Sequence, residues 1–453
     1  MAPGDIDSLD QDDLKPLVLT LLEQIKTLQA RIAELEAGAG QPPKTWTNSS
    51  IPPSKGQKAN RPDPTADKKG RKGRPGVTRA LCRDPDQVRE IYAEACSCGV
   101  ALSPADQPDV HAYDYIDLPP IKPVTTRVHV HKGTCPRCKR RVAAKPPIDM
   151  PAGSPFGPGI VAVVTYLHAC QMVSYNRLTE VLDGLLGCTL SEGAIANMLR
   201  RAARPFAEHA DAIAEIVRTS PVIASDETSA RVCGKTWWQW VFGSATAIYH
   251  TIVPTRGKVV PVEFLAGAKP DVWISDRLAA QGNHAAAHQV CLAHLIRDAQ
   301  YAIDAGDTIF APAFKSFLQR ACAIGRRRPD LADATIRAHA RALAIERDRV
   351  LVLPATATAG AELRASVSVG ARDKLLVFMT RRDVEPTNNV SEQALRMSVI
   401  FRRVTNGFRS VWGAESYADI RSIVATGRLH GRSPLDAIRA ALVAPSASEA
   451  APA

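Results

Sequence analysis

Two stretches of sequence decide the fold: Pro221-Val-Ile-Ala-Ser-Asp-Glu-Thr and Asp271-Val-Trp-Ile-Ser-Asp-Arg. In each, a short apolar run is followed by an aspartate, Asp226 or Asp276, and such a run is typical of a buried strand. A third acidic residue, Glu392, lies in Asn388-Asn-Val-Ser-Glu-Gln-Ala-Leu-Arg, a stretch with a helical pattern. We therefore expect two strands and one helix to carry one carboxylate each.

The residues around these stretches predict an α/β core. Residues 236–243 and 246–252 favour a hairpin after the first strand, 257–265 a crossover, and 288–294 a fifth strand. Residues 300–385 are rich in Ala, Arg and Leu and predict a helical insertion. Carboxylates carried in this way are typical of an RNase H-like mixed five-stranded sheet. Such a sheet holds two Mg²⁺ ions through hard oxygen ligands. The two metal ions can together bind the attacking and leaving oxygens of a phosphodiester.

Length and charge narrow the class of protein. A chain of 453 residues exceeds one ordinary core, so we expect two to four domains. The formal net charge of +11 favours a polyanionic partner. The sequence has no run of about 20 apolar residues and no basic leader, so we expect a soluble cytoplasmic protein, associated with the bacterial nucleoid.

The N-terminal residues predict self-association and DNA contact. Residues 14–35 repeat every seven, with β-branched residues at a and Leu at d, which favours a parallel two-stranded coiled coil over residues 1–37. The alternative is an amphipathic helix packed on its own protein. The heptad positions are Leu14, Val18, Leu21, Ile25, Leu28, Ile32 and Leu35. Residues 38–80 predict a disordered basic linker whose charges would bind phosphates: Lys68, Lys69, Arg71, Lys72 and Arg74.

Two close cysteine pairs, Cys96-Ser-Cys98 and Cys135-Pro-Arg-Cys138, predict a zinc-binding domain over residues 81–150. Four thiolates suit tetrahedral Zn²⁺, and the ion would staple a domain too small for its own core. The residues between the pairs alternate as strands do, at 113–118 and 125–131. His131 could replace one cysteine, and a redox pair is the alternative to a zinc site.

The other segments complete the expected domain order. Residues 151–218 are helical, with Ser191 as an N-cap, and form either a helix-turn-helix reader or a scaffold for the sheet. The core would then comprise 219–299, the insertion 300–385, and 386–432 with the Glu392 helix. Residues 433–453 would form a C-terminal helix and a disordered tail.

Taken in order, these motifs resemble the large protein of the insertion sequence sixty-six family of DDE transposases. The resemblance spans nearly the whole chain and includes Asn48-Ser-Ser-Ile-Pro-Pro-Ser and Ser225-Asp-Glu-Thr. It continues through His288-Gln-Val-Cys-Leu-Ala-His-Leu-Ile-Arg-Asp, the Glu392 motif and Gly407-Phe-Arg-Ser-Val-Trp-Gly. The chain departs from the family pattern at Arg277 after Asp276 and in the Cys-x-Cys spacing.

The resemblance implies an RNase H-like fold in which Asp226, Asp276 and Glu392 bind two Mg²⁺ ions. Such an enzyme binds the ends of its element, cleaves the DNA by hydrolysis and joins the 3′-hydroxyl ends to target DNA. A homodimer or higher oligomer and small companion proteins are also implied. Each acid has an alternative: Glu227 could replace Asp226, Asp276 could cap a helix, and Glu392 could pair with a residue one turn on, Arg396.

Several further residues are candidates for supporting roles. Asn389 lies three residues before Glu392 on the same helix face, and His294 follows the fifth strand, so both could orient the metal ligands or touch a phosphate. Four arginines after the catalytic glutamate could hold DNA phosphates. They are Arg396, Arg402, Arg403 and Arg409.

Two other functions remain open from sequence alone. A non-catalytic zinc-dependent DNA-binding regulator would explain the zipper, the basic linker and the cysteines, but not the three carboxylates. A stand-alone RNase H-like nuclease would explain the carboxylates, but not the dimerising N-terminus. Joining of a cut end to a second DNA separates a transposase from both.

Overall fold

The chain is described from a computed structural model that covers residues 19–20, 22–29, 41–45, 47–49, 79–119, 121–147, 150, 153 and 155–443. These residues fall into two compact units. The larger holds the described parts of 1–57, 128–180 and 190–453, and the smaller those of 58–127 and 181–189. None of the described helices has the length and apolar character that a membrane crossing needs.

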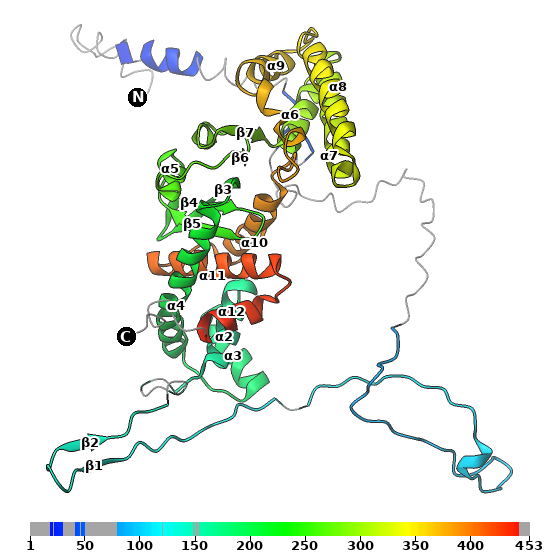
Figure 1. Cartoon of the computed structure of the whole chain (residues 1–453), viewed down its shortest axis with the longest axis vertical. Helices are drawn as coiled ribbons and strands as arrows, with labels where there is room; N and C mark the ends of the chain where they lie inside the picture. Colours follow the sequence, from blue (N-terminus) through cyan, green and yellow to red (C-terminus); the bar gives the residue numbers. More distant parts are fainter. Residues whose placement is uncertain are drawn as a thin grey trace, which may run out of the picture. The chain divides into compact units, whose positions relative to one another are not determined.

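The larger unit is built on a mixed five-stranded sheet with the strand order β5-β4-β3-β6-β7 (Figure 1). Strands β3, β4 and β5 pair antiparallel, whereas β6 pairs parallel with both β3 and β7. The expected α/β core with a mixed five-stranded sheet is thereby confirmed. The strands are β3 (Val222–Val232), β4 (Lys235–Gly243), β5 (Ile248–Val253), β6 (Val272–Ser275) and β7 (Ala287–Val290).

Strand β3 is longer than its apolar run predicts. It continues past Asp226 to Val232 because that half pairs antiparallel with β4. The connecting residues, Cys233 and Gly234, have φ of 49° and 78°. Positive φ at both positions is typical of a tight two-residue hairpin turn.

Strand β7 is shorter than predicted. Its parallel pairing with β6 ends at Val290, and Cys291 becomes the N-cap of helix α6 (Leu292–Asp304). The expectation that the strand reaches His294 was wrong, because no pairing with β6 continues beyond Val290. His294 therefore lies in the first turn of a helix.

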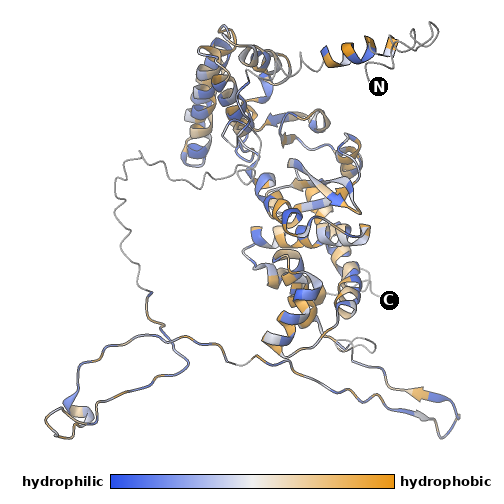
Figure 2. Cartoon of the chain, turned by 180° about the vertical axis from the view of Figure 1, so that it is seen from behind, coloured by the Kyte–Doolittle hydropathy of each residue, from blue (hydrophilic) through white to orange (hydrophobic). Residues whose placement is uncertain are grey.

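One face of the sheet packs on the helices before β3 and after residue 410. Ile223 and Trp273 point into this core cluster, with Phe206 from α4 and Val424 from α11. Ser191 caps α4 as expected, accepting a hydrogen bond from the Ala194 amide at 3.2 Å. The elements are α2 (Pro158–Thr165), a π-helical turn (Tyr166–Cys170), α3 (Tyr175–Leu186), α4 (Glu192–Arg218), α5 (Val259–Leu265), α11 (Val411–Leu429) and α12 (Pro434–Val443). Figure 2 shows hydrophilic and hydrophobic residues mixed along the helices of the chain.

A second core cluster collects the other face of β6 and the helices between β7 and α10. Ala224, Val272 and Ile274 point into it, because neighbouring residues of a strand face opposite sides. Arg328 is buried here and donates hydrogen bonds to three backbone carbonyls, those of Phe378, Arg381 and Arg382. The elements of this cluster are α6, α7 (Phe310–Arg327), α8 (Asp333–Leu351), α9 (Thr358–Gly370) and short 3₁₀ turns at Arg328–Asp330, Arg372–Lys374 and Val377–Met379. Helix α10 (Asn389–Thr405) follows them, and a further 3₁₀ turn at Ala279–Gln281 precedes β7.

The segment from Gln41 to Ser49 contacts helix α6. Asn48 is 3% exposed, and its side-chain amide donates to a carboxylate oxygen of Asp304 at 2.8 Å. Further toward the N-terminus, residues 19–20 and 22–29 are helical, with exposed Ile25 and Leu28. The other heptad positions, Leu14, Val18, Leu21, Ile32 and Leu35, lie outside the described residues, so the coiled coil stays a prediction.

The smaller unit contains little regular structure among its described residues. A bridge between Ala95 and Ala101 closes the Cys96-Ser-Cys98 turn, and a 3₁₀ turn follows at Pro104–Asp106. Residues 113–118 and 125–131 form no strand, contrary to expectation, since side chains such as Tyr115 are exposed and do not contribute to a core. In the larger unit, β1 (Lys132–Thr134) and β2 (Arg141–Ala143) form a small hairpin around the second cysteine pair.

Candidate metal centre

Asp226 lies within β3, and Asp276 directly follows the end of β6, the strand that pairs parallel with β3. The β3–β6 register pairs Val222 with Val272 and Ala224 with Ile274, an offset of 50 residues. The observed pairing ends at Ala224 and Ile274, and the same offset extended by two residues would pair Asp226 with Asp276. The two carboxyl groups are near enough for the charge of Asp276 to raise the pKa of Asp226, after the larger effects of burial and of Glu227. The 50-residue separation of these two acids therefore equals the strand register.

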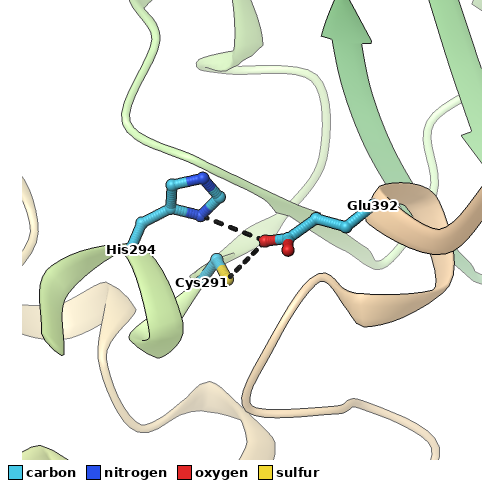
Figure 3. A group of neighbouring side chains, drawn as sticks. All are labelled: Cys291, His294 and Glu392. Atoms are coloured by element: carbon cyan, nitrogen blue, oxygen red, sulfur yellow. Dashed lines mark hydrogen bonds and ion pairs between the residues drawn. The ribbon is translucent and has the colours of Figure 1, made fainter. Parts of the chain in front are cut away.

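Glu392 lies in the first turn of α10 and points toward Cys291 and His294 (Figure 3). This helix packs against β3. One oxygen, Oε1, lies 3.3 Å from a guanidinium nitrogen of Arg297, 3.5 Å from Nδ1 of His294 and 4.0 Å from Sγ of Cys291. The predicted alternative partner, Arg396, is exposed one turn along the helix, and Glu392 is paired instead with the start of α6.

Asn388 ties the three elements of the site together. Its side-chain amide donates to the Ser225 carbonyl at 2.7 Å, immediately before Asp226. Its backbone amide donates to Sγ of Cys291 at 3.2 Å, and its carbonyl accepts from the Glu392 amide at 3.1 Å. One buried residue thus fixes the end of the β3–β6 pairing, the start of α6 and the start of α10 relative to one another.

The electrostatics show that the carboxylates are crowded. Burial raises the pKa of Asp226 well above its ordinary value, and the negative charges of Glu227, Asp276 and Glu392 raise it further. The pKa of Cys291 is raised to about 12, chiefly by burial. Burial also lowers the pKa of His294, although the charge of Glu392 opposes that shift. Without a cation, the site therefore disfavours negative charge at Asp226 and at Cys291.

Glu227, the alternative to Asp226, is engaged on the opposite face of the sheet. Its carboxylate accepts hydrogen bonds from Arg256 at 2.7 Å and from Gln281 at 2.8 Å. Arg256 stacks on the ring of Trp238 at 4.6 Å. Asp276 also has a local contact, since it accepts the Leu278 amide at 2.9 Å. The 3₁₀ turn that follows has Leu278 as its N-cap and no side-chain cap, so Asp276 does not cap it. One oxygen suffices for that bond, so the carboxylate keeps a second oxygen for a ligand.

The predicted supporting residues have different surroundings. Asn389 is exposed, whereas its neighbour Asn388 is buried. Arg402 donates to the Ser229 hydroxyl at 2.5 Å and to its carbonyl, so it braces β3. The side chains of Arg396, Arg403 and Arg409 are exposed on or just after α10. The basic residues Lys68, Lys69, Arg71, Lys72 and Arg74 lie outside the described residues.

Each cysteine pair forms a tight turn of its own. The amide of Gly99 donates to the Cys96 carbonyl at 2.9 Å, and the amide of Lys139 donates to the Cys135 carbonyl at 2.9 Å. Hydrogen bonds from Cys98 lower the pKa of Cys96, and hydrogen bonds from Cys138 lower that of Cys135. The first pair belongs to the smaller unit and the second to the larger. A shared zinc site of Cys96, Cys98, Cys135 and Cys138 therefore stays a prediction.

Sequence reasoning missed Cys291, Arg297 and Asn388. A signal for the first two was present, because Cys291, His294 and Arg297 are spaced by three residues, and this spacing places them on one face of a helix. The assignment of residues 288–294 to a strand hid that pattern. Asn388 had no such signal, because its role depends on a contact with Ser225, 163 residues away.

A comparison with protein families completes the description. The model of the family described as "Transposase IS66 family" matches residues 153–416, more than half of the chain. That range contains the sheet, the three carboxylates and the helices α6 to α10. No curated protein matches the sequence. The chain belongs to the IS66 family of transposases.

Proposed function

We propose that this protein is a Mg²⁺-dependent DNA transposase whose sheet is RNase H-like. It would bind the ends of an insertion sequence, cleave the DNA by hydrolysis and join the 3′-hydroxyl ends to target DNA. The observation that supports the proposal is the parallel pairing of β3 with β6, the strands that carry Asp226 and directly precede Asp276, together with the charges of Asp276 and Glu392, which both act on Asp226.

The three carboxylates suit hard divalent cations. They offer oxygen atoms only, which Mg²⁺ prefers. Burial, followed by the charges of Glu227, Asp276 and Glu392, raises the pKa of Asp226, and bound cations would stabilise its charged form. Two Mg²⁺ ions held by Asp226, Asp276 and Glu392 would supply activation of water, and later of a DNA 3′-hydroxyl, together with stabilisation of the leaving 3′-oxygen.

The protein side chains around the carboxylates would orient them. Asn388 fixes the start of the Glu392 helix against β3. Arg297 forms an ion pair with Glu392. When a cation binds the Glu392 carboxylate, the guanidinium of Arg297 would be released and could bind a phosphate oxygen of DNA. The Glu227–Arg256–Gln281 network braces the loop after Asp276 from the other face, because Gln281 lies five residues beyond Asp276.

The rest of the chain would hold DNA and a second subunit. The basic residues 68–74 supply sequence-independent affinity for phosphates, and Arg396, Arg403 and Arg409 extend this near the catalytic helix. The segment 41–49 contacts α6, the helix that carries His294, so the basic linker begins close to the catalytic part of the fold. The coiled coil of residues 1–37 would make the protein at least dimeric, with one structural Zn²⁺ per chain and small companion proteins as further partners.

The test is an end-joining reaction. Full-length protein is mixed with labelled DNA from the ends of its element, a target plasmid and Mg²⁺, with EDTA as control. A transposase gives cleaved ends and joined products, and Asp226→Asn, Asp276→Asn or Glu392→Gln abolishes both while gel-shift binding persists. Asp298→Asn is the matched control, because Asp298 pairs with Arg277 outside the carboxylate group. Cleavage without joining would indicate a nuclease, and binding without either would indicate a regulator.

The zinc prediction has its own test. Metal analysis of the full-length protein should show one Zn²⁺ per chain fewer after Cys135 and Cys138 are replaced by Ser. Full zinc content in a Cys98→Ser variant would instead show that a histidine such as His131 supplies a ligand.

A further inference from the structure

Cys291, His294 and Glu392 bring three different metal-binding atoms together at the start of two helices. Sγ of Cys291, a ring nitrogen of His294 and a carboxylate oxygen of Glu392 all lie within 4.8 Å of one another (Figure 3). Cys291 is the N-cap of α6, and His294 lies three residues on, so both side chains lie on one face of that helix. Glu392 faces them from the first turn of α10.

This ligand set differs in kind from the three carboxylates. A thiolate and an imidazole are poor ligands for Mg²⁺ but good ones for Zn²⁺ and other borderline cations. We propose that Cys291, His294 and Glu392 form a second, thiolate-containing site that binds Zn²⁺ in competition with Mg²⁺ for Glu392. The inhibitory consequence rests on the proposed function, whereas the binding itself rests on geometry alone.

The distances suit a tetrahedral ion with small adjustments. Zn²⁺ bonds of about 2.0 to 2.3 Å imply ligand atoms roughly 3.4 to 3.7 Å apart. The nitrogen–oxygen separation is already 3.5 Å, and the sulfur–oxygen separation is 4.0 Å. The remaining sulfur–nitrogen pair lies within 4.8 Å, so closure needs movements of about an ångström. Water would complete the fourth position.

The surroundings of the cysteine support a built site. Sγ of Cys291 is fully buried and accepts the Asn388 amide at 3.2 Å, so its position is fixed. Nδ1 of His294 is buried and makes no hydrogen bond within the described part of the chain. On binding, the ion replaces the thiol proton, which passes to solvent, and the carboxylate exchanges Arg297 for the ion.

Cobalt absorption tests binding without any DNA reaction. Full-length protein is titrated with Co²⁺, whose bond to a thiolate gives a charge-transfer band. The Cys291→Ala variant should lose one Co²⁺ per chain and the matching part of the band, and His294→Ala should bind that ion at least ten-fold more weakly. The matched control is Cys322→Ala, another buried cysteine, in α7 and outside the cluster. Its spectrum should equal that of the wild type, so the cysteines elsewhere in the chain cancel in the comparison. Identical spectra and stoichiometry for wild type and Cys291→Ala would overturn the proposal.

Inhibition is measured separately. In excess Mg²⁺, added Zn²⁺ should lower the wild-type cleavage rate, and the concentration for half inhibition should rise at least ten-fold in Cys291→Ala, each protein being compared with its own zinc-free rate. An equal response of both proteins would refute the competition at Glu392. If Co²⁺ binds through Cys291 but no variant cleaves DNA, the transposase proposal fails and the metal site stands.

Discussion

Asn388 and Asn389 are adjacent asparagines with opposite environments, and this contrast gives a sharp prediction. Asn388 is 1% exposed, and its side chain donates to the Ser225 carbonyl at 2.7 Å, whereas Asn389 is exposed. Losing a buried hydrogen bond costs about 1 to 3 kcal/mol. The side-chain oxygen of Asn388, Oδ1, is buried and makes no hydrogen bond within the described residues. Its removal therefore offsets part of this cost. We expect Asn388→Ala to lower the free energy of unfolding by about 1 to 2 kcal/mol.

The rate of end cleavage should also fall in Asn388→Ala, by more than the loss of folded protein explains. The Asn388 side chain holds the start of α10 against β3, and a displacement of the Glu392 carboxylate by about 1 Å can reduce a rate roughly 100-fold. Asn389→Ala should change the free energy of unfolding by less than about 0.5 kcal/mol. Urea unfolding and end cleavage are measured for both variants under the same conditions. Equal effects of the two substitutions, or a stable and fully active Asn388→Ala, would refute the role assigned to Asn388.

Two further predictions concern stability alone. Arg328→Met should lower the free energy of unfolding by about 3 kcal/mol, because three carbonyls lose their donor. Arg327→Met, at an exposed neighbour, should change the free energy of unfolding by less than about 0.5 kcal/mol. A similar loss of stability in both variants would contradict the role of Arg328. Burial, with the charges of Asp211 and Glu415, raises the pKa of Asp419 to about 7. Because the pKa of Asp419 is higher in the folded state than in the unfolded state, the protein loses stability as the pH rises from about 4 to about 7. Asp419→Asn removes this titration, so it should raise the free energy of unfolding by about 1 to 3 kcal/mol at pH 8 and change it little at pH 4. A gain independent of pH, measured by urea unfolding at both values, would count against this.

The sequence patterns were sufficient for the sheet and for the strands carrying Asp226 and Asp276. Short apolar runs, each followed by an aspartate, mark the two parallel strands, because both faces of such strands are covered. The same patterns gave wrong element ends at two places. Strand β3 runs on to Val232 since its partner β4 continues, and β7 stops at Val290 where pairing with β6 ends. Strand ends depend on partners that lie elsewhere in the chain.

The surroundings of the candidate site were less accessible to sequence reasoning. Arg297 and Cys291 contact Glu392 across about 100 residues of intervening helices. Local periodicity carries no information on which helices meet. The sequence therefore suggested a pair between Glu392 and Arg396 on the same helix, and it could not predict the contact of Glu392 with Arg297 of α6. Helical spacing likewise does not show which of the two adjacent asparagines is buried against Ser225, and it is Asn388 that makes this contact.

The central claim is that Asp226 and Asp276 are ligands of the catalytic metal ions, and a metal-specificity switch tests it most directly. Mn²⁺ accepts sulfur ligands more readily than Mg²⁺ does. Asp226→Cys and Asp276→Cys should each lose end cleavage in Mg²⁺ and recover a measurable part of it in Mn²⁺, while Asp298→Cys cleaves in both. Recovery of cleavage in Mn²⁺ by both variants is the predicted result. Full activity of either variant in Mg²⁺, or equal inactivity in both ions, would contradict the assignment.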